Sequence, residues 1–276
     1  MQPRDHHFTG PLLDGVSLHV REWGPETGPI IVLLHGGGAN VHWWDHLAPG
    51  WAGSHRIVAL DFRGHGDSDH PEEREVGAFN VDLDALVAHL GTERVVLVGH
   101  SMGAHVALDH ASRYPATRGV VLIDPSRVGG GGTKRSRRRA RLALAFKRSY
   151  PSRDEAIRRF QFLPPSEHAA ESLRAAIAAD SVREEADGRF GYKFDPRWFS
   201  LPPRPAPDLG AVEAPVVVVR GAESALLSDE GAADLAASLR DGRVEVVSGA
   251  GHHVLLDAPA ALSGVVSEFV RALPED

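Results

Sequence analysis

The chain has 276 residues, a length that allows one large hydrophobic core or two modest ones. Its 30 basic and 37 acidic residues give a formal net charge of −7, which argues against general nucleic-acid binding. The absence of cysteine excludes disulfides, thiolate metal sites and a cysteine nucleophile. No apolar run follows residues 1–7 as a secretory signal requires, and no stretch approaches the ~20 apolar residues of a membrane span. We therefore expect a cytoplasmic protein without membrane or nucleic-acid partners.

Two early strands are expected at 17–22 and 30–34, separated by a turn rich in glycine and proline. The second strand runs into His35-Gly36-Gly37-Gly38. Three glycines after a buried strand let the backbone approach a ligand closely and point N–H groups at it, although a flexible turn has the same composition. Trp43 and Trp44 follow, and we expect them either to line the mouth of a pocket or simply to pack.

A further strand is expected at 56–60, and the loop Asp61-Phe62-Arg63-Gly64-His65-Gly66-Asp67-Ser68 follows it. Apolar residues then recur at helical spacing between 79 and 90 and form one face of a helix. This alternation of strands and helices predicts an α/β protein with a mostly parallel, doubly wound sheet.

The stretch most informative about function begins at residue 95. Residues 95–98 form an unbroken apolar run, as expected of a strand buried on both faces, and a helix follows. Between them lies Gly99-His100-Ser101-Met102-Gly103. A Gly-x-Ser-x-Gly pattern at a sharp strand-to-helix turn lifts the serine above the sheet, and any larger residue at Gly99 or Gly103 is expected to clash. The Met102 N–H then lies at a helix N-terminus, where it can face a developing oxyanion.

These motifs resemble the α/β-hydrolase family along nearly the whole chain. The resemblance implies that the glycine loop supplies a second oxyanion-hole donor, which we assign to Gly37, with Gly38 as the alternative. It also implies that the loop at 61–68 is structural, so no chemistry is assigned to Asp61 or His65. No metal and no cofactor are expected for the reaction.

After a strand expected at 119–123, the composition changes. Residues 127–153 contain ten basic residues and no acidic one. The family commonly inserts a helical cap here, so the resemblance implies a core at 1–125 and 206–276 and a helical cap at 126–205. Gly129–Gly132 are expected to form a flexible hinge. Arginines between 137 and 141 either clamp an anionic substrate or form a solvated helix face.

The core is expected to resume with a strand at 216–219, a helix at 230–239 and a strand at 244–247, and to end in a helix whose apolar face spans 262–270. Before this last helix stands Gly249-Ala250-Gly251-His252-His253, which is similar to the histidine loop of the family. The resemblance makes His252 the general base. His253 is its rival, and otherwise a pocket or surface group.

The position of the acid departs from the common family pattern. Most members carry it shortly after the strand at 216–219, where this chain has Ser224 and Ala225. Some members, haloalkane dehalogenases and certain serine hydrolases among them, take it from the end of the preceding strand, about two dozen residues after the nucleophile. Asp124 stands 23 residues after Ser101 and at the active-site edge of the predicted sheet, so we choose it. Glu223 is the second candidate and Asp229 the third.

A serine hydroxyl needs a base within hydrogen-bond reach and a carboxylate that orients the base. We therefore expect a serine hydrolase that cleaves a small-molecule ester, lactone, thioester or amide through an acyl-enzyme. A carbon–carbon bond hydrolase and a cofactor-free perhydrolase share the triad, and a non-enzymatic binding protein is favoured only by the missing aspartate after Gly221. The sequence leaves the oligomeric state open. Residues expected near the substrate are Gly38, His100, Trp43, Trp44 and His253.

Overall fold

The computed structural model of the protein describes residues 2–125, 148–166, 168–202 and 205–274. The expectations for Gly129–Gly132 and for the arginines between 137 and 141 fall outside these residues. Within the described part of the chain, every helix is too short or too polar to cross a membrane.

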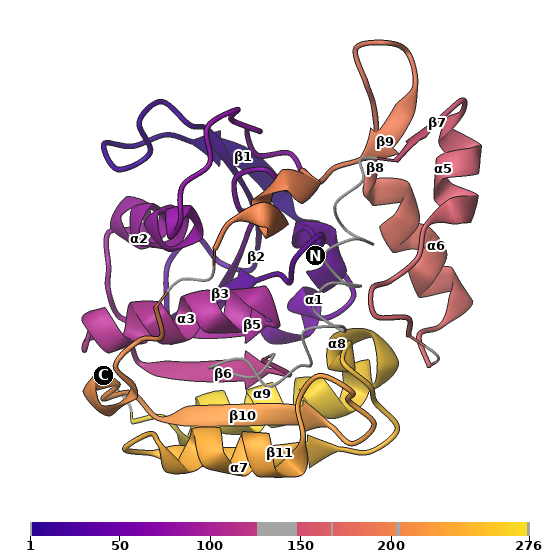
Figure 1. Ribbon diagram of the computed structural model, residues 1–276. Helices are drawn as coiled ribbons and strands as arrows, with labels where there is room; N and C mark the ends of the chain where they lie inside the picture. The colour runs from indigo at the N-terminus through magenta and orange to yellow at the C-terminus, as the bar shows by residue number, and fades with distance from the viewer. Residues whose placement is uncertain (1, 126–147, 167, 203–204, 275–276) are drawn as a thin grey trace.

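A single eight-stranded sheet forms the centre, with the strand order β1-β2-β4-β3-β5-β6-β10-β11 (Figure 1). The first two strands run antiparallel to their neighbours, and the six strands from β4 to β11 are parallel. The expectation of an α/β fold with a mostly parallel sheet is therefore confirmed. The strands are β1 (Arg4–Phe8), β2 (Leu18–Trp23), β3 (Ile30–Leu34), β4 (Arg56–Leu60), β5 (Val95–His100), β6 (Gly119–Ile123), β10 (Val216–Gly221) and β11 (Gly242–Val247).

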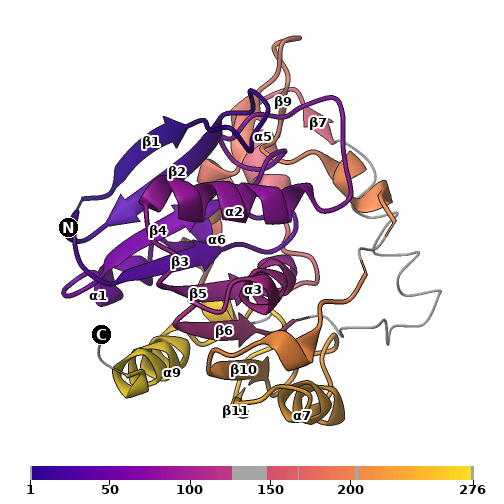
Figure 2. The same cartoon turned by 90° about the vertical axis from the view of Figure 1, so that its left-hand side faces the viewer.

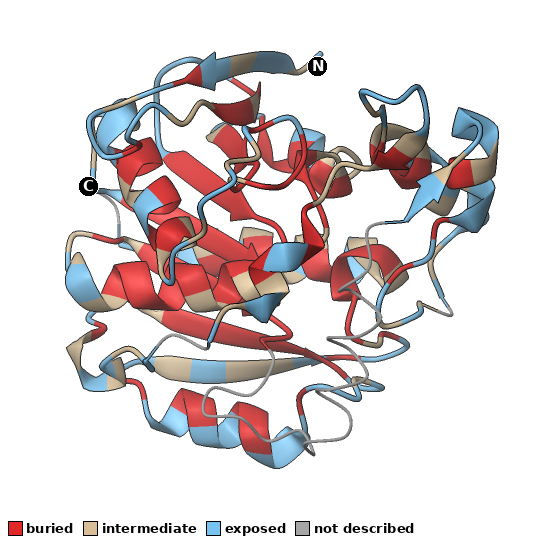
Figure 3. Ribbon diagram, turned by 45° about the horizontal axis from the view of Figure 1, so that its top comes forward, coloured by how far each residue is buried: buried red, intermediate tan, exposed pale blue. Residues whose placement is uncertain are grey.

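Helices cover both faces of the sheet (Figure 2). One hydrophobic cluster joins the sheet to α2 (Ala78–Leu90), α3 (Met102–Arg113) and α7 (Asp229–Ala237). A second cluster joins the opposite face to α1 (Ala48–Trp51), α8 (Val254–Asp257) and α9 (Pro259–Ala272). Because β3, β5 and β6 lie between two apolar layers, every residue in them is buried (Figure 3). The described residues also form the 3₁₀ helices η1 (Val41–Trp44), η2 (Pro196–Ser200) and η3 (Leu209–Ala211).

The segment expected to be a helical cap contains a small sheet as well. Its described elements are β7 (Ser149–Tyr150), α5 (Arg153–Arg159), α6 (Glu171–Asp180), β8 (Val182–Glu184) and β9 (Phe190–Tyr192). The strands pair antiparallel in the order β7-β9-β8. Strands of two or three residues are too short to show an alternating pattern, which explains why the sequence indicated only helices. These elements form a separate lobe at the end of the sheet where β6 and β10 point (Figure 1).

Candidate active site

Ser101 occupies the turn between β5 and α3. Its backbone is in a strained conformation, with φ 51° and ψ −109°. The turn is tight: a Cβ on Gly99 would come within 2.5 Å of the Gly103 backbone, and one on Gly103 within 2.3 Å of the Leu34 carbonyl oxygen. The expected need for both glycines is therefore confirmed. The Ser101 N–H donates to the carbonyl of Ile123 at 2.9 Å, so the turn is anchored to β6.

Three chain segments bring a serine, a histidine and an aspartate into one hydrogen-bonded row. His252 Nε2 lies 3.1 Å from Ser101 Oγ, and His252 Nδ1 lies 2.8 Å from Asp124 Oδ1. The Asp124 side chain is fully buried and that of His252 nearly so, whereas Ser101 is partly exposed. The row can therefore pass a proton from the serine to the imidazole while the carboxylate holds the ring in place.

Asp124 is fixed by more than the histidine. The Gly221 N–H donates to its Oδ2 at 3.1 Å, and the Ser224 hydroxyl donates to its Oδ1 at 2.7 Å. Its backbone has φ 42°, and among described residues only Asp14 and Ser101 share a positive φ without being glycine. Such conformations cost of order 1–3 kcal/mol each and cluster at functional sites. Sequence reasoning noted Ser224 only as the residue in the usual place of the acid and did not anticipate its hydrogen bond.

The other two candidate acids point elsewhere. The Glu223 side chain is 55% exposed and pairs with His168 Nε2 at 2.8 Å. The Asp229 side chain is 82% exposed and pairs with Arg220 Nη1 at 2.9 Å. His252 contacts neither of them in the described structure; its Nδ1 is bonded to Asp124.

The glycine loop after β3 lies against the nucleophile. A Cβ on Gly36 would come within 2.7 Å of His100 Nδ1 and 3.3 Å of Ser101 Cβ, so the loop backbone passes directly beside the serine. Gly37 packs against Phe199 of η2, and Gly38 has a left-handed φ of 76°. Met102 is the first residue of α3, so its N–H has no acceptor within the helix.

Aromatic and histidine rings surround the row. Trp43 stacks on His100 with ring centroids 6.3 Å apart, and it meets His253 and Phe162 edge-on at 5.4 and 5.2 Å. Phe162 comes from the inserted segment, and the sequence held no signal for it. Trp44 is fully buried in the second hydrophobic cluster, so it belongs to the core and does not line a pocket mouth.

Two of these histidines are uncharged at neutral pH. Burial, followed by the charges of His252 and His253, lowers the pKa of His100 well below 6.5. Burial and the charge of His252 lower the pKa of His253 to about 3. His253 is therefore a poor rival for the role of base, and its Nε2 is already bonded to the Pro164 carbonyl at 2.8 Å.

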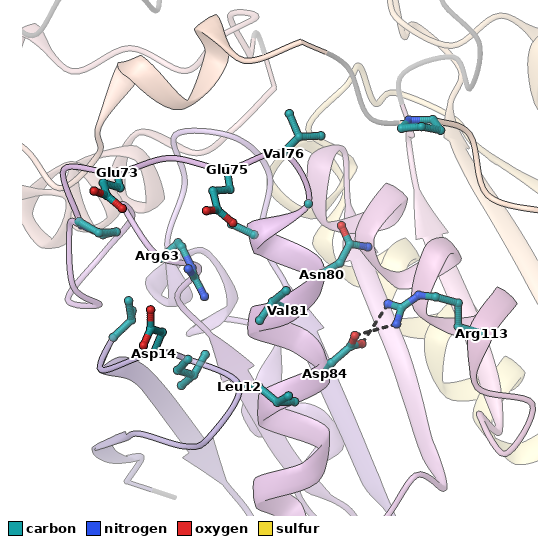
Figure 4. Close-up of a pocket in the computed structure, with 16 residues that line it drawn as sticks. Leu12, Asp14, Arg63, Glu73, Glu75, Val76, Asn80, Val81, Asp84 and Arg113 are labelled. Atoms are coloured by element: carbon teal, nitrogen blue, oxygen red, sulfur yellow. Dashed lines mark hydrogen bonds and ion pairs between the residues drawn. The ribbon is translucent and has the colours of Figure 1, made fainter.

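A separate cavity of about 630 Å³ lies beside α2 (Figure 4). Neither Ser101, Asp124 nor His252 lines it, and its polar lining includes the ion pair between Asp84 and Arg113 at 2.7 Å. This cavity is distinct from the candidate active site, which lies at the edge of the sheet around Ser101.

Comparisons with known proteins place the chain among hydrolases of one family. Residues 31–265 match the alpha/beta hydrolase family. The chain is 29% identical to esterase Rv0045c of Mycobacterium tuberculosis over 88% of this chain and 83% of the relative. It is 28% identical to 2-(acetamidomethylene)succinate hydrolase of Mesorhizobium japonicum over 96% of both chains. The crystal structure of an alpha/beta hydrolase from Novosphingobium aromaticivorans has a TM-score of 0.80 and 26% identity, covering 98% of this chain and 99% of that one.

Proposed function

Because the chain belongs to the alpha/beta hydrolase family and is a hydrolase, we propose that it cleaves carboxylic esters or related carbonyl substrates through an acyl-enzyme. Ser101 is the nucleophile, His252 the general base and then acid, and Asp124 the orienting carboxylate. The observation that carries this proposal is the continuous row of hydrogen bonds from Ser101 Oγ through both nitrogens of His252 to Asp124.

The reaction follows from the roles of these groups. His252 Nε2 accepts the hydroxyl proton as Ser101 Oγ attacks the carbonyl carbon, and the backbone N–H groups of Gly37 and Met102 stabilise the oxyanion. The tetrahedral intermediate collapses when His252 returns the proton to the leaving group. Water then attacks the acyl-enzyme in the same way and releases the acid. Each oxyanion donor contributes roughly 10² to 10³ in rate.

An ester is the preferred substrate class because an esterase is among the relatives and the described surroundings of the row are aromatic. The name of the second relative refers to a succinate derivative, which supports an anionic substrate as the second candidate. A matched pair of substrates separates the two: a neutral phenyl ester and the corresponding succinate half-ester. A higher kcat/KM for the neutral ester is the expected result.

The first experiment measures intact-protein mass after incubation with a fluorophosphonate, with Ser101→Ala as the control. A single stoichiometric adduct that the variant lacks is expected, because the reagent needs an activated serine and a formed oxyanion site. Folded wild-type protein without an adduct would contradict the proposal and favour a protein that binds its ligand without turning it over.

A further inference from the structure

The cavity beside α2, which we call the α2 cavity, has the size of a ligand site. Its volume of about 630 Å³ falls within the range of roughly 300–1,000 Å³ that is typical of small-molecule sites. The loop between β1 and β2, the segment that precedes α2, and α2 itself supply most of its lining (Figure 4). These side chains form two sets of different chemistry, one apolar and one made of hydrogen-bond acceptors.

The first set consists of apolar side chains that are exposed to solvent. Leu12, Val76 and Val81 are all exposed, and all three line the cavity. Among the described residues, the other large apolar side chains that are equally exposed lie elsewhere, and they are Leu163, Leu226 and Val246. Exposed apolar side chains that gather around one hollow, with polar groups at its rim, indicate a binding surface. The cavity can therefore cover the apolar part of a ligand.

The charged side chains of the cavity favour a cation. Arg63 is already paired with Asp82, with 2.7 Å between Arg63 Nη2 and the carboxylate. Arg113 is paired with Asp84 at 2.7 Å in the same way. Three further carboxylates in the lining are exposed and form no ion pair within the described part of the chain: Asp14, Glu73 and Glu75. The cavity thus offers carboxylates to a ligand, whereas its guanidinium groups are occupied.

Asn80 adds a buried acceptor to these carboxylates. The residue is only 7% exposed, lies in the first turn of α2 and lines the cavity. Asn80 Nδ2 donates to Asp109 Oδ2 at 2.7 Å, and because a carboxylate only accepts, this bond fixes which end of the amide carries the oxygen. In Figure 4 the oxygen points towards the side of the cavity where Val76 lies. The side chain forms no other hydrogen bond with a described residue, so its Oδ1 is available to a donor.

We propose that the α2 cavity binds an organic amine, whose ammonium group is joined to an apolar chain. An ammonium group only donates hydrogen bonds, so it complements the amide oxygen and the carboxylates, which only accept them. The apolar chain leaves water when it covers the exposed apolar side chains of the lining. A carboxylate ligand would instead meet charges of its own sign. None of the proposed catalytic residues lines the cavity, so this proposal does not rest on the proposed function.

A series of ligands of matched length tests the chemistry by titration calorimetry on wild-type protein. Octylammonium should bind once per chain. Octan-1-ol and octanoate keep the chain but lose the positive charge, so each should bind about tenfold more weakly or worse. Butylammonium should also bind roughly tenfold more weakly or worse, because it lacks four of the methylenes that the cavity covers. No binding of octylammonium, or equal binding of octan-1-ol, would overturn the proposal.

Lysine substitutions test whether the amine binds in this cavity. Leu12→Lys and Val81→Lys each place an ammonium group of the protein among the carboxylates, so each should weaken octylammonium binding by about tenfold or more. Val246→Lys is the matched control, because Val246 is 52% exposed, Leu12 is 53% exposed, and β11 does not line the cavity. Urea midpoints establish that all three variants are folded. Equal affinities of the three would place the amine elsewhere and refute the proposed site.

Two further cations separate a shaped site from general attraction to an acidic surface. Octyltrimethylammonium keeps the chain and the charge but has no N–H group, so it should bind about threefold to tenfold more weakly, as expected for one lost hydrogen bond. Equal affinity would refute the role of Asn80. Spermidine carries more charge and no long apolar chain, and it should bind more weakly than octylammonium; tighter binding of spermidine would overturn the proposal. Calorimetry needs no turnover, so a protein that hydrolysed no ester would refute the proposed function alone.

Discussion

Two of the buried histidine–aspartate pairs among the described residues look alike and differ in their third partner. His252 Nδ1 lies 2.8 Å from Asp124, and His19 Nδ1 lies 2.8 Å from Asp61. The far nitrogen of His252 faces the Ser101 hydroxyl at 3.1 Å, whereas that of His19 faces the Asp5 carboxylate at 3.2 Å. A histidine between two carboxylates is held protonated and has no lone pair for a substrate or a nucleophile.

The pKa of His19 agrees with this difference. Burial alone lowers it, but the hydrogen bond to Asp61 and the charges of Asp61, Asp67 and Asp5 outweigh burial and raise it above 6.5. Asp61 also accepts from the N–H groups of Val41 and Asp67, at 2.8 and 3.0 Å. The pair thus ties loops together, as expected from the family resemblance. A buried histidine–aspartate pair is therefore evidence of catalysis only where the second nitrogen meets a nucleophile.

The largest expected effect is on kcat, when Asp124 and Asp61 are each replaced by asparagine. Asp124→Asn should lower kcat on the order of 10⁴-fold, because the amide no longer holds His252 in the tautomer that accepts the serine proton. Asp61→Asn should change kcat by less than about tenfold, although both variants lose on the order of 1–3 kcal/mol of unfolding free energy through broken buried hydrogen bonds. Ester kinetics and urea unfolding of both proteins test this. If folded Asp61→Asn protein were as inactive as Asp124→Asn, the distinction between a catalytic and a structural histidine–aspartate pair would fail.

The second prediction moves the acid to the position that most family members use. Ser224 Oγ lies 2.7 Å from Asp124 Oδ1, which itself contacts His252, so a carboxylate at 224 can reach the same ring nitrogen. The double variant Asp124→Asn with Ser224→Asp should recover on the order of 10-fold in kcat over Asp124→Asn. Asp124→Asn with Ser224→Asn is the matched control and should recover nothing. Recovery in both would show that charge at 224 is irrelevant.

The fold was predictable where burial produces a continuous apolar run. The strands expected at 30–34, 56–60 and 119–123 agree with β3, β4 and β6. The first strand, Arg4–Phe8, was missed because only Phe8 in it is buried; this edge strand forms through backbone pairing with β2, which leaves no hydrophobic pattern.

The residues of the candidate site also differ in how far the sequence alone identifies them. Ser101 and His252 lie in local motifs that can be read from a few neighbouring residues. The role of Asp124 depends on contacts with Gly221 and His252, which are 97 and 128 residues away along the chain. Local sequence therefore left Asp124, Glu223 and Asp229 open, and only the spatial arrangement distinguishes them.

A smaller effect is expected from the hydroxyl that supports the acid. Ser224 donates to the same Asp124 oxygen that faces His252, so Ser224→Ala should lower kcat about threefold to tenfold, equivalent to one hydrogen bond of 0.5–1.5 kcal/mol. KM should be nearly unchanged, because the hydroxyl meets the acid and not the substrate. Ser224→Thr keeps the hydroxyl and should restore the rate. If the threonine variant is as slow as the alanine variant, the side chain matters for packing alone.

The smallest effect is the dependence of stability on pH in the structural pair. The pKa of His19 is raised in the folded protein. Its contribution to the free energy of unfolding is therefore complete below about pH 6.5, the ordinary histidine value, and is lost as the pH rises through the raised value. The pKa of Asp61 is lowered: burial opposes this, but the hydrogen bond to His19 and the charges of His35 and His19 prevail. Its contribution is therefore lost only in acid.

The urea midpoint of wild-type protein, relative to that of His19→Gln, should thus be highest near pH 5.5 and fall towards pH 9. His7 is a second titratable histidine whose ring lies 5.0 Å from that of His19, and His7→Gln serves as the control. The urea midpoint of this control should depend on pH almost as it does in the wild type, because His7 faces a backbone carbonyl and no carboxylate in the described structure. A difference between wild type and His19→Gln that stays constant with pH would mean that His19 is neutral when folded, and the two pairs would then differ less than their geometry implies.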